Sequence, residues 1–216
     1  MQVKESRPKP SGPHVISPPR RRNDVPPRLT ALARLALAED RAWADVTVRA
    51  VVRPGTRARA RIVARQAGVV AGLAAAAAVF RVRSARLRVR ILAADGLRVR
   101  PGRAVLEIAG PADALLSAER TALNLLQRMS GVATLTRRCV DRARGTRAVI
   151  LHTRKTTPLW RDAERAAVLA GGGRLHRRDL ASGILIKENH FAAARARSPD
   201  AVRRIVAQAR AGRRPG

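Results

Sequence analysis

The first half of the chain contains short runs in which apolar residues alternate with arginine, the pattern of half-buried strands. Within residues 57–66, the even positions from 58 to 64 are alanine or isoleucine, and the odd positions are mostly arginine. The same period of two returns at 87–91 and 104–108, and Asp95-Gly96 supplies a turn between these two runs. Three strands are therefore predicted in this part of the chain.

Two helices are predicted to accompany these strands. Leucines recur at helical spacing after Pro26-Pro27, and this helix is expected to end near Glu39-Asp40. Residues 69–80 are too rich in alanine for a strand and favour a helix packed closely on a sheet. Residues 28–111 are thus predicted to form a small α/β sandwich domain. Residues 1–27, rich in proline and arginine, are expected to be a disordered basic tail.

From Ala112 onward the helical period dominates, and Ser130-Gly131 predicts a break between two helices that end near Met129 and Arg144. A βαβ unit is predicted next, with a strand at 147–152, a helix at 161–169 and a second strand at 184–186. A last helix is predicted at 199–211. Residues 112–216 are therefore predicted to be part of an α/β barrel. The predicted class is α/β, with an α+β sandwich domain followed by an incomplete, open α/β barrel.

The composition argues against a nucleic acid or a membrane as the main partner of this protein. The formal charge is +30, yet arginine is spread along the whole chain and aromatic residues make up only 2%. Without a localised stripe or stacking side chains, specific nucleic-acid binding is not the favoured function, although a basic nucleic-acid-binding protein remains an alternative. No run approaches the ~20 apolar residues of a membrane span, and no secretory signal is present, so a cytoplasmic protein is expected. Cys139 is the only cysteine and is predicted to be a small buried residue.

Cationic residues stand where the predicted strands end. Thr153-Arg154-Lys155 follows the first strand, His176-Arg177 follows Gly171-Gly172-Gly173, and Lys187 follows the second strand. The glycines are interpreted as allowing close approach of a ligand to the backbone. Because βαβ units carry ligands at the carboxyl ends of their strands, these loops are predicted to meet at one opening. An opening lined in this way suits a small substrate with several carboxylate or phosphate groups.

The lysines add to this prediction. Only four of the 45 basic residues are lysine, and two of them are Lys155 and Lys187. Where arginine is the usual base, this placement suggests that a compact ammonium group is needed at both points.

Five segments, in order along residues 28–195, resemble the quinolinate phosphoribosyltransferase family, also called nicotinate-nucleotide pyrophosphorylase (carboxylating). They are Leu37–Asp40 followed by Asp45-Val46-Thr47, Glu119–Asn124 through Ser130-Gly131, Thr153–Pro158, Gly171–Gly173 with His176-Arg177, and Leu185–His190. The resemblance implies a pentosyltransferase of de novo NAD synthesis. Quinolinate and 5-phosphoribosyl 1-pyrophosphate, with Mg²⁺, would give nicotinate mononucleotide, pyrophosphate and carbon dioxide.

The resemblance also assigns roles to residues. Lys155 and Lys187 are the catalytic candidates, and the substrate-binding candidates are Arg120, Thr153, Arg154, Lys155, His176, Arg177 and Lys187. Arg120 is expected to reach the site of the partner subunit in a homodimer. No metal ligand is predicted among the residues present, because the family's acidic magnesium ligands belong to later βα units.

The chain departs from the family at several points. His152 stands where the family usually has Asp, Leu175 where it has Asn, and Pro158-Leu159-Trp160 replaces Pro-Gly-Leu. Because the later βα units do not follow, a C-terminally truncated barrel with weak or absent activity on its own is expected. The alternatives are a ModD-like relative linked to molybdenum transport, or an inactive remnant that only dimerises.

Overall fold

The computed structural model describes residues 26–212. Its first helical elements are α1 (Pro27–Glu39), the 3₁₀ turn η1 (Ala42–Ala44) and α2 (Val46–Val51). The predicted helix after Pro26 is confirmed as α1, with proline in its first turn where no backbone donor is needed. The side chain of Asp45 accepts a hydrogen bond from Val48 N at 2.9 Å and so caps α2. The predicted tail lies almost wholly outside the described residues.

An antiparallel sheet with the order β1-β5-β3 follows, built from β1 (Arg57–Val63), β3 (Arg88–Ile91) and β5 (Ala104–Pro111). All three predicted strands are therefore confirmed. In the register, Arg61 and Arg90 lie opposite Glu107 on either side, and both form ion pairs with it. The arginines on β1 and β3 thus face solvent, while the alternate positions face the helices.

The helix predicted from the alanine-rich run begins later than expected, because the chain first forms a short strand. β2 (Gly68–Val69) pairs with β4 (Arg98–Val99), and α3 (Leu73–Arg83) then begins after Gly72 at φ +94°. Asp95 accepts hydrogen bonds from Gly72 N and Leu73 N at 3.0 and 3.1 Å, which satisfies two donors at the start of α3. Burial raises the pKa of Asp95 despite these hydrogen bonds.

The predicted break at Ser130-Gly131 is wrong. A single helix, α4 (Ala112–Arg142), runs through both residues. The hydroxyl of Ser130 accepts a hydrogen bond from Ala71 N at 3.0 Å and so joins α4 to the segment before α3. Because the apolar face of α4 packs continuously on the core, its burial outweighs the ~1 kcal/mol that glycine costs inside a helix.

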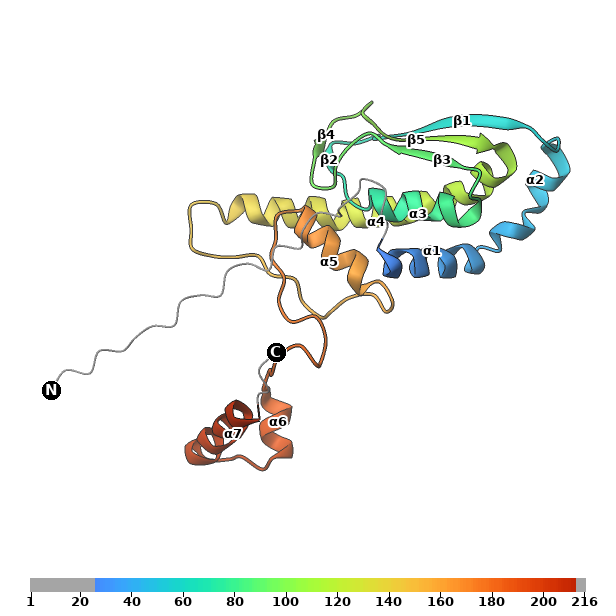
Figure 1. The fold of residues 1–216 in the computed structure, drawn as a ribbon. Helices are drawn as coiled ribbons and strands as arrows, with labels where there is room; N and C mark the ends of the chain where they lie inside the picture. The colour runs from blue at the N-terminus through green and yellow to red at the C-terminus, as the bar shows by residue number, and fades with distance from the viewer. Residues whose placement is uncertain (1–25, 213–216) are drawn as a thin grey trace.

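One core joins the helices and the inner face of the sheet. Its most deeply buried side chains come from α1, α3, β5 and α4, and the largest are Phe80, Leu37, Leu73, Leu106, Ile108, Leu125 and Met129. α3 and α4 lie beneath the sheet, and α1 lies on the side of α3 away from it (Figure 1). The predicted burial of Cys139 is wrong, since this residue lies on the exposed face of α4.

The predicted βαβ unit is present only in part. Its helix is confirmed as α5 (Arg161–Ala170), but the first predicted strand is reduced to a single parallel bridge between Leu151 and Arg174. Residues 184–186 form no strand; they are largely exposed and pair with nothing in the described part of the chain. Because a parallel strand needs neighbours on its edges, one bridge does not propagate into a sheet here.

The last two helices are α6 (Glu188–Ala193) and α7 (Pro199–Ala211). The bounds predicted for the last helix agree with those of α7. Neither helix has a buried residue, and both stand apart from the body formed by α1 to α5 (Figure 1). The α/β class is confirmed, and the part of the chain predicted to belong to a barrel contributes α5, the single bridge and these two helices after α4.

Candidate functional site

The two main predicted site segments lie side by side, because the bridge joins them in parallel. Arg174 N donates to Ile150 O at 2.8 Å, and His152 N donates to Arg174 O at 3.0 Å. Both segments run in the same direction through this bridge, so the residues after it emerge at the same end. The structure therefore brings together the loop that begins at Thr153 and the loop that contains His176.

The loop after Thr153 is anchored by a buried carboxylate on α5. Glu164 accepts hydrogen bonds from Thr157 N at 3.4 Å and from Thr157 Oγ1 at 2.9 Å. Arg128 on α4 approaches both, with Nη2 at 3.1 Å from Thr157 Oγ1 and 3.2 Å from a Glu164 oxygen. The loop is thereby fixed against two helices, and its cations project from an ordered base.

Within this loop the predicted residues differ in exposure. Thr153 and Lys155 are exposed, and Thr153 Oγ1 accepts a hydrogen bond from Lys155 N at 3.2 Å. Arg154 is half-buried, and its Nε is buried with no hydrogen-bond partner among the described residues. A buried guanidinium N–H without an acceptor costs ~1–3 kcal/mol, so an anionic ligand at this point would relieve a real penalty.

The sharp turn before Trp160 places Leu159 at φ +66°, in the left-handed region that favours glycine. Leu159 is 82% exposed, so no burial of its side chain offsets this conformation. The departure from the family's Pro-Gly-Leu therefore leaves the backbone turn in place at an energetic cost.

Gly171 and Gly173 pack closely against helices, which gives them a structural role, and the interpretation of the three glycines as a point of close ligand approach stays a prediction. A side chain at Gly171 would lie 2.5 Å from Ala133 O on α4, and one at Gly173 would lie 2.7 Å from a Val168 methyl group on α5. Gly172 adopts φ +87°. The glycines allow the chain to turn tightly between α4 and α5, and this turn leads it into the bridge.

The second loop carries His176 and Arg177. His176 is exposed, whereas Arg177 is half-buried and donates from Nη1 to Gly183 O at 3.3 Å. His152, only 5% exposed, lies beneath this loop: its Nδ1 accepts a hydrogen bond from His176 N at 2.7 Å. Its Nε2 lies 2.8 Å from Nη1 of Arg165 on α5. The residue that departs from the family thus sits between the two loops.

The charges that shift the pKa of the His152 ring are all positive. Burial, followed by the charges of Arg165, His176 and Arg161, lowers the pKa of the His152 ring. Burial also lowers the pKa of the Arg165 guanidinium, against the opposing effect of Asp162 and Asp179. The ring is therefore neutral at neutral pH and lies in a strongly cationic surrounding.

The two remaining predicted residues lie elsewhere. Arg120 is exposed on α4, eight residues and so about 12 Å along the helix from Arg128. Lys187 is exposed at the start of α6, where its N–H donates to His190 Nδ1 at 3.0 Å. No hydrogen bond or ion pair described for residues 26–212 joins either of them to the two loops. Their convergence on the site stays a prediction.

Sequence reasoning missed the supporting residues, namely Arg128, His152, Arg161, Glu164 and Arg165. Two signals were available for them. Acidic residues are scarce, only 15 in the chain, so a glutamate in the first turn of α5 next to the cationic loop was informative. Arg161 and Arg165 are four residues apart and so share one face of that helix.

In residues 26–212 no group of three or more His, Cys, Asp or Glu side chains could hold a metal ion. No helix in the same range has the length and hydrophobicity required to cross a membrane.

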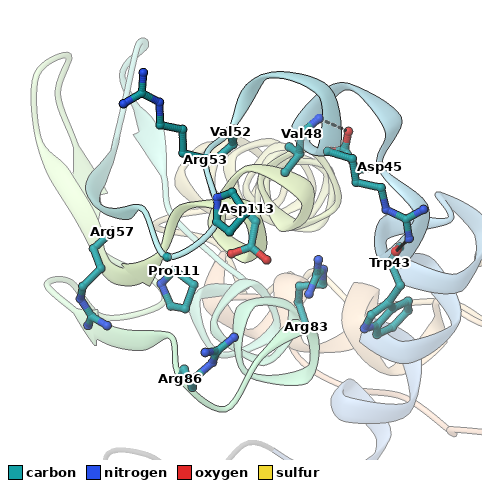
Figure 2. A pocket seen from close by; sticks show the side chains of 13 residues that line it. Trp43, Asp45, Val48, Val52, Arg53, Arg57, Arg83, Arg86, Pro111 and Asp113 are labelled. Atoms are coloured by element: carbon teal, nitrogen blue, oxygen red, sulfur yellow. Dashed lines mark hydrogen bonds between the residues drawn. The ribbon is translucent and has the colours of Figure 1, made fainter.

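A separate cavity of about 510 Å³ lies at the start of α4 (Figure 2). Trp43, Arg83 and Asp113 line it, together with Val48 and Arg49 of α2. None of the predicted site residues lines this cavity, whose charged lining consists of the arginines Arg49, Arg53, Arg57, Arg83 and Arg86 and the carboxylates of Asp45 and Asp113. It is therefore distinct from the candidate site.

Curated relatives share much of this sequence. The chain is 42% identical over 167 residues to the chloroplastic nicotinate-nucleotide pyrophosphorylase (carboxylating) of Arabidopsis thaliana, covering 77% of this chain and 47% of that protein. It is 44% identical over 165 residues to the nicotinate-nucleotide pyrophosphorylase (carboxylating) of Mycobacterium leprae, covering 74% and 57%. The chain thus spans about half the length of the curated relatives it matches.

Solved structures agree with this. The NadC crystal structure from Streptococcus pyogenes matches with a TM-score of 0.79 and 37% identity, over 87% of this chain and 65% of that one. The nicotinate-nucleotide pyrophosphorylase from Francisella tularensis matches with a TM-score of 0.74 and 33% identity, over 86% and 65%. The models of the quinolinate phosphoribosyl transferase N-terminal and C-terminal domains match residues 45–130 and 132–213. On this sequence and structural evidence, the chain belongs to the quinolinate phosphoribosyltransferase family.

Proposed function

We propose that this chain carries the substrate-binding loops of a quinolinate phosphoribosyltransferase of NAD biosynthesis. The reaction transfers the phosphoribosyl group from 5-phosphoribosyl 1-pyrophosphate to quinolinate with loss of carbon dioxide. Its products are nicotinate mononucleotide and pyrophosphate. Family membership supports this reaction, and the geometry of the two loops supports the location of the site.

The observation that carries the proposal is the parallel bridge between Leu151 and Arg174. It places the loop with Arg154 and Lys155 beside the loop with His176 and Arg177 at one end of the bridge. Two carboxylates and a pyrophosphate repel one another, so a site that unites them requires cations from more than one side. These two loops supply such cations, and the buried Nε of Arg154 still requires an acceptor.

The chemistry needs positioning and charge stabilisation, and no covalent nucleophile. The quinolinate ring nitrogen forms a bond to C1 of the ribose as the bond to pyrophosphate breaks, and the leaving oxygen keeps the electron pair. The ring nitrogen is then positively charged, so the adjacent carboxylate departs as carbon dioxide and its electron pair remains on the ring carbon, which takes up a proton. Lys155 and Lys187 are proposed to stabilise the charges that develop, and Thr153, Arg154, His176 and Arg177 to orient the substrates.

Magnesium is proposed to arrive with the substrate. Because residues 26–212 offer no cluster of ligands for a metal ion, the described side chains would not hold Mg²⁺ themselves. The pyrophosphate group is a good Mg²⁺ ligand, and the bound ion would lower the negative charge that the cationic loops must offset.

Arg120 is proposed to act across a homodimer. It is exposed on α4 and joined to neither loop of its own chain by a hydrogen bond or ion pair in the described residues. Mixing the variants Arg120→Ala and Lys187→Ala, each expected to bind quinolinate weakly, tests this idea. If Arg120 serves the partner's site, mixed dimers regain one intact site, and a quinolinate-binding signal returns that neither variant shows alone.

The proposed function is tested by titration calorimetry with quinolinate. Binding is measured in preference to turnover, because the chain spans about half the length of its relatives. Arg154→Ala and Lys187→Ala are each expected to weaken binding at least tenfold, since each removes a charge-assisted contact worth ~1.5–3 kcal/mol.

Arg100→Ala provides the matched control, because this exposed arginine lies just after β4 and carries the same charge. It is expected to leave the affinity unchanged. Equal quinolinate binding in all four proteins would refute the site. No quinolinate binding together with steeply salt-dependent DNA binding would instead favour the nucleic-acid-binding alternative.

A further inference from the structure

Each ring nitrogen of His152 faces a hydrogen-bond donor. The backbone N–H of His176 lies 2.7 Å from Nδ1, and Nη1 of Arg165 lies 2.8 Å from Nε2. A backbone amide and a guanidinium can only donate, whereas a neutral imidazole has one nitrogen that accepts and one that donates. The ring can therefore satisfy only one of its two neighbours.

The hydrogen bond with His176 decides which tautomer forms. The bridge fixes Arg174, two residues before His176, through hydrogen bonds with Ile150 O and His152 N, and so restricts the direction of the His176 amide. Nδ1 is then the acceptor and Nε2 carries the proton. Arg165 has a second acceptor within reach, the His176 carbonyl at 3.5 Å, and its long side chain can shift toward it.

Protonation of the ring would remove the bond with His176. An imidazolium has two N–H groups and no acceptor, so its Nδ1–H would face the N–H of His176. The surrounding charges add to this effect. Arg161 and Arg165 on α5 and His176 on the second loop are all basic, while Asp162 and Asp179 act on Arg165 and not on the ring. Among the described residues, no carboxylate is a cause that raises the pKa of the buried ring.

We propose that His152 is a positioning residue whose neutral ring holds His176 and the second loop in place, and whose protonation releases them. The consequence for ligand binding, but not the positioning itself, rests on the proposed function. An anion site that contains an exposed histidine ordinarily binds its ligand more tightly as the pH falls. Here the affinity for quinolinate should instead weaken as the pH falls, because the loop that carries His176 is no longer held in its binding position.

The positioning role is tested first without any ligand. Nitrogen-15 NMR of the imidazole rings assigns the His152 signals by comparison with His152→Asn. The expected result is the tautomer protonated at Nε2, a pKa below the ~6.5 of an unfolded histidine, and loss of the His176 amide hydrogen bond as the ring titrates. A ring protonated at Nδ1, or a His176 amide signal that does not respond to this titration, would overturn the proposal.

The ligand arm measures the dissociation constant of quinolinate between pH 5 and 7.5. Because only the neutral form is competent, affinity in the unmodified chain should fall about tenfold one pH unit below the pKa of His152. His152→Asn retains an acceptor for His176 that does not titrate, and His152→Asp offers two. Both variants should lack this loss at low pH.

The outcomes separate this inference from the proposed function. A loss of affinity that is the same in His152→Asn as in the unmodified chain would overturn the inference, as would tighter binding at low pH. Absence of quinolinate binding at every pH would reject the proposed function alone. The NMR result would then still decide whether His152 positions His176.

Discussion

Leu159→Gly is expected to stabilise the protein, because leucine at this position holds a backbone conformation that suits glycine. Its φ is +66°, and a left-handed conformation costs a residue with a Cβ atom ~1–2 kcal/mol. Glycine removes that cost but adds ~0.5–1 kcal/mol of conformational entropy to the unfolded chain. The side chain is 82% exposed, so its removal loses only about 0.3 kcal/mol of apolar burial. The expected net gain is about 0.5 kcal/mol.

Urea denaturation compares this variant with two controls. Leu159→Ala keeps the Cβ atom and therefore the strain, so it should lose about 0.3 kcal/mol. Leu180→Gly removes a side chain that is 75% exposed at a position with ordinary backbone, and should lose about 1 kcal/mol. The contrast between the two glycine variants is then about 1.5 kcal/mol. If Leu159→Gly lost as much stability as Leu180→Gly, the argument from backbone strain would be refuted.

Three further predictions concern the base of the site. Gly171→Ala should lower the free energy of unfolding by about 2–3 kcal/mol, because its Cβ would lie 2.5 Å from a carbonyl oxygen of α4. The control Gly131→Ala, whose Cβ would have no atom within 4 Å, should raise it by about 1 kcal/mol. Equal effects of the two variants in urea titrations would contradict this prediction. Glu164→Ala should lower the free energy of unfolding by about 2–3 kcal/mol and weaken quinolinate binding, since Thr157 loses its acceptor. An unchanged quinolinate affinity in titration calorimetry would argue against the anchoring role of Glu164. The pKa of His152 is lower in the folded protein than the ~6.5 of an unfolded histidine, so the contribution of this residue to the free energy of unfolding should be full above about pH 6.5 and fall as the pH drops through the folded pKa. His152→Asn should flatten this part of the plot of unfolding free energy against pH. An unchanged slope in the variant would contradict the prediction.

The local pattern of the sequence was sufficient for most elements. The strands β1, β3 and β5 followed from two-residue alternation, and α5 and α7 from helical spacing. The loop position of Arg154 and Lys155 followed from their place after an apolar run, and that of His176 and Arg177 from the three glycines before them. These features depend on neighbours within a few residues, so the sequence is enough to predict them.

Tertiary packing decided the elements whose energetics involve distant residues. α4 passes through Ser130-Gly131 because the hydroxyl of Ser130 bonds Ala71 and the helix buries a continuous face. The predicted strands at 147–152 and 184–186 lack the edge partners that would extend them, so only the bridge at Leu151 remains. Local propensity counts for less than burial and pairing in each case.

The candidate site shows the same division. The sequence by itself determined which residues supply positive charge, because charge belongs to the side chain. Only the tertiary structure decided which groups hold the loops that carry those charges. Glu164 binds Thr157 in the first loop, and His152 lies between the backbone of His176 and the guanidinium of Arg165. Hydrogen bonds act over about 3 Å between groups that are far apart along the chain, so their partners are known only once the chain is folded.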